Sequence, residues 1–368
     1  MSGVPQGSVG MDGRTTTSGR IPTALRDREL ESFGTPDPRI LVCGCGGSGN
    51  NTMNRITHIG VEGAITVAIN TDKQHLDHTR AMQKLLVGRH ITRGLGAGGN
   101  PDIGAQSARE QIHELKAAIQ GADMVFVCAG LGGGTGSGVA PVAAQVAQEQ
   151  GAIVIGVVTM PFSIEKARID KAEFALKQLR EVSNTVIVID NNRLSSIAGN
   201  LPIRQAFAVA NELISTMIKS IVEIISVPSL INLDYADVRA IMSSGGVSVT
   251  GIGEADGDKR VDEATKRALS NPLLDVSYDG STGAMIHITG GPDMTLDEAE
   301  RVGEIITAGL DADANVIWGA RIDDEMRGKI RVMTIITGVK SPYVLGKGRA
   351  RPSPQALEMN HELGLETI

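Results

Sequence analysis

Residues 130–138 read GLGGGTGSG, between the apolar run Met124–Ala129 and the helical pattern AAQVAQEQ. Five of the last seven residues in this loop are glycine, which is more than a tight turn requires. Glycines here let backbone N–H groups turn toward a ligand, and the positive end of the following helix also attracts anions. With hydroxyls at Thr135 and Ser137, the loop suits a polyphosphate.

A second glycine loop, GCGGSGNN over residues 44–51, precedes a helical pattern with Met53, Ile56 and Ile59 on one face. Taken alone, this loop and Asp72 beyond the next apolar run are also typical of a dinucleotide-binding fold. An NAD-dependent oxidoreductase is therefore the alternative, but such folds need one glycine loop and this chain has two. Neither loop has the Gly-Lys-Ser/Thr ending of a Walker P-loop. Backbone amides, helix dipoles and Mg²⁺ would have to neutralise a bound nucleoside triphosphate.

Short apolar runs alternate with helical patterns from Arg39 onward. The runs are apolar almost throughout, as expected when helices cover both faces of a parallel sheet. This part of the chain is therefore predicted to be a doubly wound, Rossmann-like α/β domain. Its predicted strands are Ile40–Cys43, Ile65–Ile69, Met124–Ala129, Ile153–Val158 and Val186–Ile189.

A long helix is predicted within residues 201–228, LPIRQAFAVANELISTMIKSIVEIISVP. Apolar residues recur at helical spacing from Ile203 to Ile225, Pro202 suits a first turn, and Pro228 stops the helix. About 26 residues at a rise of 1.5 Å span about 39 Å, so the helix can connect two domains as a rigid strut.

Strands and helices are mixed from about residue 229 to 340, which predicts a smaller α+β domain. Thr295 and Glu298 have the spacing of a capping box. The predicted strands are Ala284–Thr289, Ala314–Ala320 and Lys329–Val339, and the predicted helices are Asp258–Ser270 and Thr295–Leu310.

The two ends of the chain differ from the middle in composition. The first 38 residues are rich in Gly, Ser, Thr, Pro and Arg without periodicity, so a disordered arm is expected. A flexible tail is expected at the other end, whose apolar last residues could serve as a short docking motif. The predicted organisation is an arm at 1–38, a nucleotide-binding domain at 39–200, a central helix at 201–228, an α+β domain at 229–340 and a tail at 341–368.

Composition excludes several classes of protein. Hydrophobic residues make up 41% and charged residues 21%, and no apolar run reaches the roughly 18 residues that suggest a membrane span. The polar first part carries no secretory signal. A cytoplasmic protein without direct membrane insertion is therefore expected. The net charge of -7 argues against nucleic-acid binding, which needs a basic surface.

Cysteines and histidines suggest no metal site. Cys43, Cys45 and Cys128 lack the spacing of a zinc site or a disulfide framework, so they are expected to be small core residues. His75 and His78 could share a helix face, but no further ligand completes a site and they are assigned no role.

The glycine loop resembles the tubulin signature GGGTGSG, and further motifs resemble the FtsZ members of the tubulin superfamily. They are the first loop, NTD from Asn70 to Asp72, RGLGAGGNP from Arg93 to Pro101, and NLDYADV over residues 232–238. The motifs occur in the expected order over roughly residues 39–340, and AGGNP and KAR favour an archaeal form. The resemblance implies the tubulin/FtsZ fold, GTP or GDP with Mg²⁺, and a cell-division GTPase that polymerises head to tail.

The resemblance also implies which residues bind the nucleotide. Ala97, Gly98 and Gly99 would lie near the γ-phosphate, and Phe207 and Asn211 would stack on and hydrogen-bond the guanine. Without the resemblance, Phe207 would read as a core residue, whereas Asn211 would need hydrogen-bond partners. Further implied contacts in the two glycine loops are Gly46, Gly47, Ser48, Gly49, Asn50 and Asn51 in the first, and Gly133, Gly134, Thr135 and Gly136, at the α- and β-phosphates, in the second. Asn191 would contact the base or ribose. The last implied contacts are Glu165 and Arg168 in PFSIEKAR, which have one residue less between them than in bacterial relatives.

Catalysis is assigned to Asn232, Asp234 and Asp237, after the central helix. If that helix is a straight strut, these residues lie beyond reach of phosphates held by the glycine loops of the same chain. The acids of one subunit would then orient water at the phosphates of its neighbour, so that hydrolysis requires assembly. One alternative for the acids is a solvated loop with Asp234 as a helix N-cap. Another is a scaffold that polymerises without turnover.

The implied partner is the chain itself, as a head-to-tail homopolymer. Membrane-tethering or division proteins are expected to bind through the C-terminal tail, at a ring in the middle of the cell. Nucleic acid is not expected as a partner.

Overall fold

The computed structural model describes residues 38–192, 194, 200–227, 229–231, 233–243, 248–270, 278 and 280–339, without the side chains of Ile203 and Ser243. All of them belong to one compact unit that begins at Pro38. Predictions for the arm up to Asp37, for Pro228, for Asn232 and for the tail lie outside the described residues. The predicted domain boundaries at residues 200 and 228 stay predictions.

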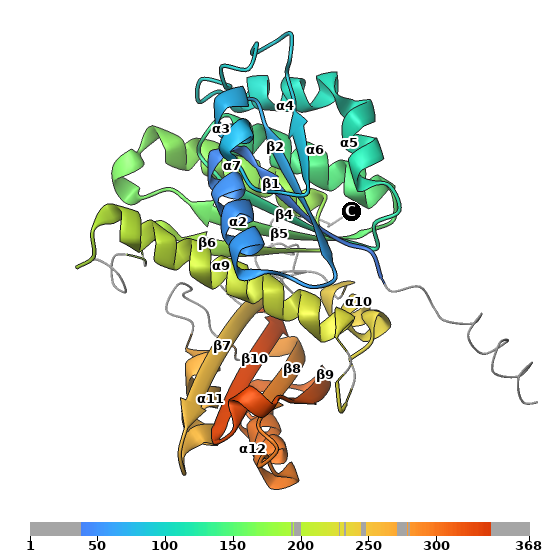
Figure 1. The fold of residues 1–368 in the computed structure, drawn as a ribbon, viewed down its shortest axis with the longest axis vertical. Coiled ribbons are helices and arrows are strands. Elements are labelled where there is room, and N and C mark those ends of the chain that lie inside the picture. Colours follow the sequence, from blue (N-terminus) through green and yellow to red (C-terminus); the bar gives the residue numbers. More distant parts are fainter. Residues whose placement is uncertain are drawn as a thin grey trace, which may run out of the picture. The chain divides into compact units, whose positions relative to one another are not determined.

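A six-stranded parallel sheet forms the first part, in the order β3-β2-β1-β4-β5-β6 (Figure 1). The five predicted strands are all present, each slightly longer than predicted. β3 was not predicted. It is an edge strand of four residues, QKLL, of which three are not buried, so its sequence lacks the apolar run of the other strands. The strands are β1 (Ile40–Cys45), β2 (Ala64–Asn70), β3 (Gln83–Leu86), β4 (Met124–Gly130), β5 (Ile153–Met160) and β6 (Thr185–Asp190).

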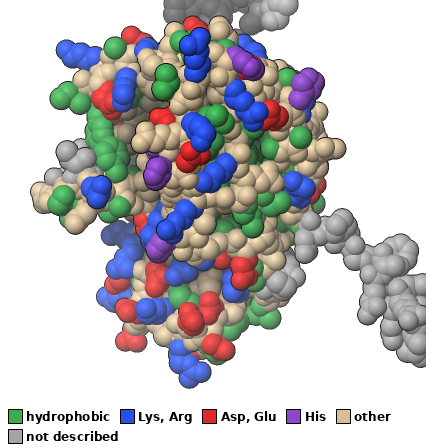
Figure 2. Space-filling model, turned by 45° about the horizontal axis from the view of Figure 1, so that its top comes forward, with side chains coloured by type: hydrophobic (Ala, Val, Ile, Leu, Met, Phe, Trp, Pro, Cys, Tyr) green, Lys and Arg blue, Asp and Glu red, His purple; other side chains and the backbone are tan. Residues whose placement is uncertain are grey.

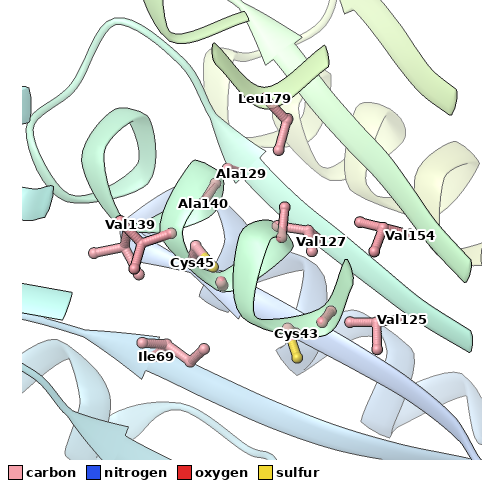
Figure 3. Packing of buried hydrophobic residues seen from close by; sticks show 14 of the residues in the cluster. Cys43, Cys45, Ile69, Val125, Val127, Ala129, Val139, Ala140, Val154 and Leu179 are labelled. Atoms are coloured by element: carbon pink, nitrogen blue, oxygen red, sulfur yellow. The ribbon is translucent and has the colours of Figure 1, made fainter. Parts of the chain in front are cut away.

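Helices cover both faces of this sheet, which confirms the doubly wound prediction. Cys43 and Cys45 lie in the core on one face, as Figure 3 shows, and Cys128 lies in the core on the other face. All three cysteines are free and buried, and burial raises the pKa of the Cys43 thiol to about 12. The helices are α2 (Gly46–Ile59), α3 (Lys73–His78), α4 (Pro101–Glu110), α5 (Ile112–Ile119), α6 (Thr135–Glu149) and α7 (Ala167–Glu181), with the 3-10 turn η1 (Ser163–Glu165).

The predicted long helix is α9 (Ile203–Ser226), which lies between the two sheets (Figure 1). Ile214, Ile218 and Ile221 on this helix share one hydrophobic cluster with Phe126 of the first sheet and Met333 of the second. The helix also packs along α2, where the Lys219 ammonium donates to the carbonyl of Ile59 at 3.3 Å. A single core therefore runs from the first sheet through α9 into the second.

The second sheet has the order β7-β10-β8-β9, with β10 antiparallel to both neighbours and β9 parallel to β8 at the edge. The capping box at Thr295 and Glu298 is present. The predicted helix from Thr295 ends at Thr307 rather than at Leu310, which instead begins β9. The elements are α10 (Tyr235–Ser243), β7 (Ser248–Asp256), α11 (Arg260–Leu269), β8 (Ser281–Gly290), α12 (Leu296–Thr307), β9 (Leu310–Ile322), η2 (Asp324–Met326) and β10 (Lys329–Thr337).

Two surface features concern membranes and charged partners. Among the described helices, none is both long and apolar enough to cross a membrane. The face shown in Figure 2 carries Lys and Arg side chains interspersed with Asp and Glu. Positive and negative side chains are therefore mixed over that face.

Candidate functional site

The two glycine loops meet at the carboxyl ends of neighbouring strands. β1 runs directly into α2 at Gly46, and β4, its hydrogen-bonded neighbour, leads through the loop to α6 at Thr135. A Cβ added to Gly46 would lie 2.7 Å from the backbone nitrogen of Gly136, and Gly46 has a φ of +72°. Only glycine permits this approach, and it brings the N-termini of two helices to one point, where both attract anions.

A third segment, Ala97–Gly99, completes the cradle. A Cβ on Gly134 would lie 2.9 Å from the Cβ of Ala97 and 3.0 Å from the nitrogen of Gly99. On the other side the cradle is open, since a Cβ on Gly98, Gly99 or Gly133 would meet nothing within 4 Å. Backbone N–H groups in these open positions are suited to phosphate oxygens.

Asn50 is the one fully buried amide in the first turns of α2. Its side chain is 0% exposed, and neither its oxygen nor its nitrogen has a hydrogen-bond partner among the described residues. Buried amides are almost always hydrogen-bonded, so the missing partners of the Asn50 amide, one residue beyond the glycine Gly49, require an explanation. Ser48 and Asn51 on the same helix are exposed.

The two hydroxyls of the second loop have different roles. Thr135 is half-buried, and its Oγ1 lies 2.6 Å from Oγ1 of the buried Thr71. Ser137 is buried, and its Oγ accepts a hydrogen bond from the Gly132 N–H at 2.8 Å. The interpretation of Ser137 as a phosphate-binding hydroxyl is therefore corrected: its oxygen closes the loop from within.

Glu165 and Arg168 form an ion pair with each other, with Arg168 Nη1 2.6 Å from Glu165 Oε2. The other carboxylate oxygen of Glu165 accepts from the Phe162 N–H at 3.0 Å. The backbone of Arg168 lies against the second glycine loop, because a Cβ on Gly132 would lie 2.8 Å from its carbonyl oxygen. The pair therefore borders the cradle.

Phe207 stands near the start of α9, 42% exposed, and its ring makes an edge-to-face contact with Phe162 at a centroid distance of 5.9 Å. This exposure contradicts the reading of Phe207 as a core residue. Asn211 is half-buried one turn further along α9, and Asn191 is half-buried just beyond the end of β6. Sequence reasoning missed Phe162, which places an aromatic wall beside Phe207.

The acidic loop lies between α9 and α10. Asp234 Oδ1 accepts from the Asp237 N–H at 2.8 Å, and Asp237 Oδ2 accepts from the Asp234 N–H at 3.2 Å. The N-cap interpretation of Asp234 is therefore confirmed, and the cap uses one oxygen of each carboxylate. Leu233, directly before the pair, is 3% exposed and belongs to the core around α9.

The acids and the cradle lie at opposite ends of the first sheet. The Tyr235 hydroxyl donates to the carbonyl of Asp123 at 2.7 Å, and Asp123 immediately precedes β4. The glycine loop begins at Gly130, where β4 ends. Seven strand residues at about 3.3 Å each separate these two points by about 23 Å. The acidic loop that starts at Asp234 therefore lies far from the cradle of its own chain.

Two residues that an oxidoreductase or a metal site could have used, Asp72 and His78, make hydrogen-bond contacts within the fold instead. The Asp72 carboxylate, which a dinucleotide fold would offer to a ribose, accepts from the His75 N–H at 2.9 Å and caps α3. His78 Nδ1 lies 2.8 Å from the carbonyl of Gln74. Within the described part of the chain, no group of three or more His, Cys, Asp or Glu could hold a metal ion.

Comparison with known proteins gives a consistent result. Residues 39–199 match "Tubulin/FtsZ family, GTPase domain", and residues 246–340 match "FtsZ family, C-terminal domain". Cell division protein FtsZ 2 of Methanocaldococcus jannaschii is 58% identical over 320 residues, which cover 86% of this chain and 84% of that protein. Cell division protein FtsZ 2 of Halobacterium salinarum is 55% identical over 316 residues, covering 86% and 80%.

Solved structures agree. An empty FtsZ dimer of M. jannaschii matches with a TM-score of 0.79 at 48% identity, covering 85% of this chain and 92% of that chain. CetZ2 of Haloferax volcanii, a GTPγS-bound protofilament, has a TM-score of 0.72 at 23% identity and shares the fold. The comparisons give no support to the oxidoreductase alternative.

Proposed function

Because this chain belongs to the tubulin/FtsZ family, as an FtsZ-type GTPase of cell division, we propose how its own residues bind GTP and where they hydrolyse it. The cradle would hold the phosphates, with Gly46, Gly47, Gly49, Gly133, Gly134 and Gly136 supplying backbone N–H groups and Ala97, Gly98 and Gly99 meeting the γ-phosphate. Ser48, Asn51 and Thr135 would add side-chain contacts at its rim. The orphaned amide of Asn50 supports this assignment, because a nucleotide would supply its missing partners.

The base and ribose would lie beyond the cradle, toward α9. Phe207, held against Phe162, offers a partly exposed ring for stacking, and Asn211 lies one turn further on. Asn191, Glu165 and Arg168 would contact the ribose side once the Glu165–Arg168 pair opens toward the ligand.

Mg²⁺ would accompany the nucleotide and offset charge on the phosphates. Magnesium keeps several waters and binds substrate phosphates with few protein carboxylates. The absence of a carboxylate cluster in the described part of the chain fits such a site.

Hydrolysis would take place between subunits, and the observation that carries this proposal is the separation of the acids from the cradle along β4. A second copy stacked head to tail would bring Asp234 and Asp237 over the phosphates of the first. The two carboxylates would orient the attacking water, and Asn232 would help to position the γ-phosphate. The empty FtsZ dimer of M. jannaschii supports the proposal that this chain self-associates.

In such a filament, exposed apolar side chains near either half-site would be candidates for burial at the contact. Leu95 is 85% exposed next to the cradle, Ile164 is 86% exposed in the segment with Glu165, and Leu230 is 73% exposed before the acidic loop.

In the cell, the filament would form a ring at the division site. Tethering or division proteins would bind the C-terminal tail, whose apolar last residues offer a short docking motif.

The test is Asp234→Asn, because asparagine caps helices about as well as aspartate and removes only the charge. We expect filaments to pellet with GTP as before, and phosphate release to fall at least about 100-fold, as when one transition-state contact is lost. Asp256→Asn, at an exposed position near the end of β7, is the control and should turn over normally. Normal turnover by Asp234→Asn filaments would contradict the catalytic assignment, and absence of turnover in unmodified filaments would favour the scaffold alternative.

A further inference from the structure

The acidic loop lies on the edge strand of the second sheet. Ile231 and Ala320 form an isolated antiparallel bridge, with the Ile231 N–H donating to the Ala320 carbonyl at 3.0 Å and the Ala320 N–H donating back at 3.2 Å. β9 is hydrogen-bonded to β8 on its other side, so this bridge occupies its open edge. The chain just before Asp234 is thereby attached to β9.

Gly319 lies directly under this attachment. A Cβ at position 319 would lie 2.8 Å from the carbonyl oxygen of Ile231, 2.9 Å from Cγ of Leu233 and 3.2 Å from its Cδ1. The first contact is with backbone, and the second is with the branch point of a side chain that is 3% exposed. The Ile231 carbonyl is held in the bridge and the buried Leu233 side chain has little room to turn, so a side chain at 319 has to displace Ile231 and Leu233.

The loop has little freedom to absorb such a displacement. Beyond Leu233, the reciprocal cap joins Asp234 to Asp237, and Tyr235 is fixed to the carbonyl of Asp123. A shift at Ile231 and Leu233 therefore moves Asp234 relative to the first sheet, and so changes where the two carboxylates lie.

We propose that Gly319 is a positioning residue for GTP hydrolysis, whose missing side chain lets β9 hold the acidic loop in its working place. The inference rests on the proposed role of Asp234 and Asp237. It adds to the machinery for hydrolysis a residue of the second sheet, whereas the glycine loops follow strands of the first. Gly319 touches no substrate and acts through the backbone at Ile231 and the side chain of Leu233.

The experiment compares Gly319→Ala with Gly303→Ala in the full-length chain. Gly303 lies within α12 of the same domain, and a Cβ there would meet nothing within 4 Å. Nucleotide affinity is measured on dilute protein, filament mass by sedimentation, and phosphate release per pelleted subunit. For Gly319→Ala we expect GTP affinity within twofold of the unmodified chain and a kcat about 10- to 100-fold lower, since misplacement by about 1 Å can cost 100-fold. KM should change little, and Gly303→Ala should match the unmodified chain.

One further variant and one further measurement keep the result interpretable. Leu233→Ala removes the loop side of the same contact, so it should also lower kcat while GTP affinity is retained, even if Gly319→Ala folds poorly. Fluorescence of Trp318, the single tryptophan of the chain, reports whether β9 remains intact.

Asp234→Asn separates the two possible failures. If Asp234→Asn filaments are inactive and folded Gly319→Ala filaments turn over at the normal rate, the positioning role is wrong and the proposed function stands. If Asp234→Asn filaments are fully active, the proposed function itself fails. Equal loss of GTP affinity and turnover in Gly319→Ala would also overturn the inference, because it would indicate general structural damage.

Discussion

At the scale of single residues, Asn50 shows how a ligand can be inferred from what a side chain lacks. An amide that is buried without partners costs free energy unless something supplies hydrogen bonds. Asn50 has two such atoms beside a cradle of glycines. The folded chain therefore carries a local cost that a bound nucleotide would remove.

We expect Asn50→Ala to weaken GTP binding while leaving the stability of the nucleotide-free protein almost unchanged. Loss of hydrogen bonds worth about 1–3 kcal/mol should weaken GTP binding roughly 5- to 150-fold. The free energy of unfolding without nucleotide should change little, because removal of an unsatisfied group compensates for the small cavity. Calorimetric titration and urea unfolding of the nucleotide-free protein measure the two quantities. Gln178→Ala, at an exposed position on α7 outside the proposed site, is the comparison, and a large loss of stability with unchanged affinity would rule out the ligand role.

Residues that carry the same chemistry in sequence can differ in role once folded. Thr135 and Ser137 are two positions apart in one loop, yet the first is half-buried and pairs with Thr71, whereas the second is fully buried and accepts from Gly132. The direction of each hydroxyl depends on where α6 begins, which the glycine-rich sequence does not specify.

At the scale of secondary-structure elements, β8 carries a buried histidine beside the strand that seats the acidic loop. Burial, and to a smaller extent the charge of Arg321, lowers the pKa of His287 to about 4 from its usual 6.5. Its Nε2 has no hydrogen-bond partner among the described residues. The ring is therefore neutral in the folded protein at neutral pH.

His287 should make the stability of this sheet depend on pH. Between about pH 6.5 and 4 the unfolded chain binds a proton that the folded chain does not, so the free energy of unfolding falls as pH falls through this range. The free energy of unfolding should fall by about 3 kcal/mol over this pH range. Urea unfolding at pH 7 and pH 4.5 tests this, with His287→Leu expected to flatten the difference. His58→Leu, at an exposed position on α2, should leave the difference in stability between the two pH values unchanged. If His287→Leu shows the same difference as the unmodified chain, other groups cause the pH dependence.

Elements at sheet edges were the hardest to predict. β3 has four residues, half of them polar, and β9 begins where the preceding helix was expected to end. β3 and the first half of β9 bury little and so need little apolar pattern, whereas the central strands β1, β4 and β5 are buried on both faces and read as continuous apolar runs.

At the scale of the whole molecule, α9 sets the separation between the two half-sites. Phe207 near its start lies beside Phe162 at the cradle end, and the acidic loop follows its other end. With 24 residues, the helix spans about 36 Å. Because it is packed between both sheets, it cannot bend to bring the two ends together.

This geometry predicts a concentration threshold for turnover. Phosphate release per molecule should be close to zero in dilute protein and rise steeply above the concentration at which filaments form, because only a filament contains complete sites. Phosphate release measured over a dilution series, with light scattering in parallel, gives both curves. Equal turnover per molecule at all concentrations would show that one chain closes its own site.

The sequence by itself determined the two glycine loops, the parallel strands that carry them, the long helix and the acidic motif, because each of these is a local pattern of residue types. The direction of the Ser137 hydroxyl, the orphaned amide of Asn50, the aromatic wall of Phe162 and the seat of the acidic loop on Gly319 were decided only by the tertiary structure. The physical reason is that each depends on a close approach between segments distant in the chain. Such distances follow from how α9 and the two sheets pack, and no local pattern encodes them.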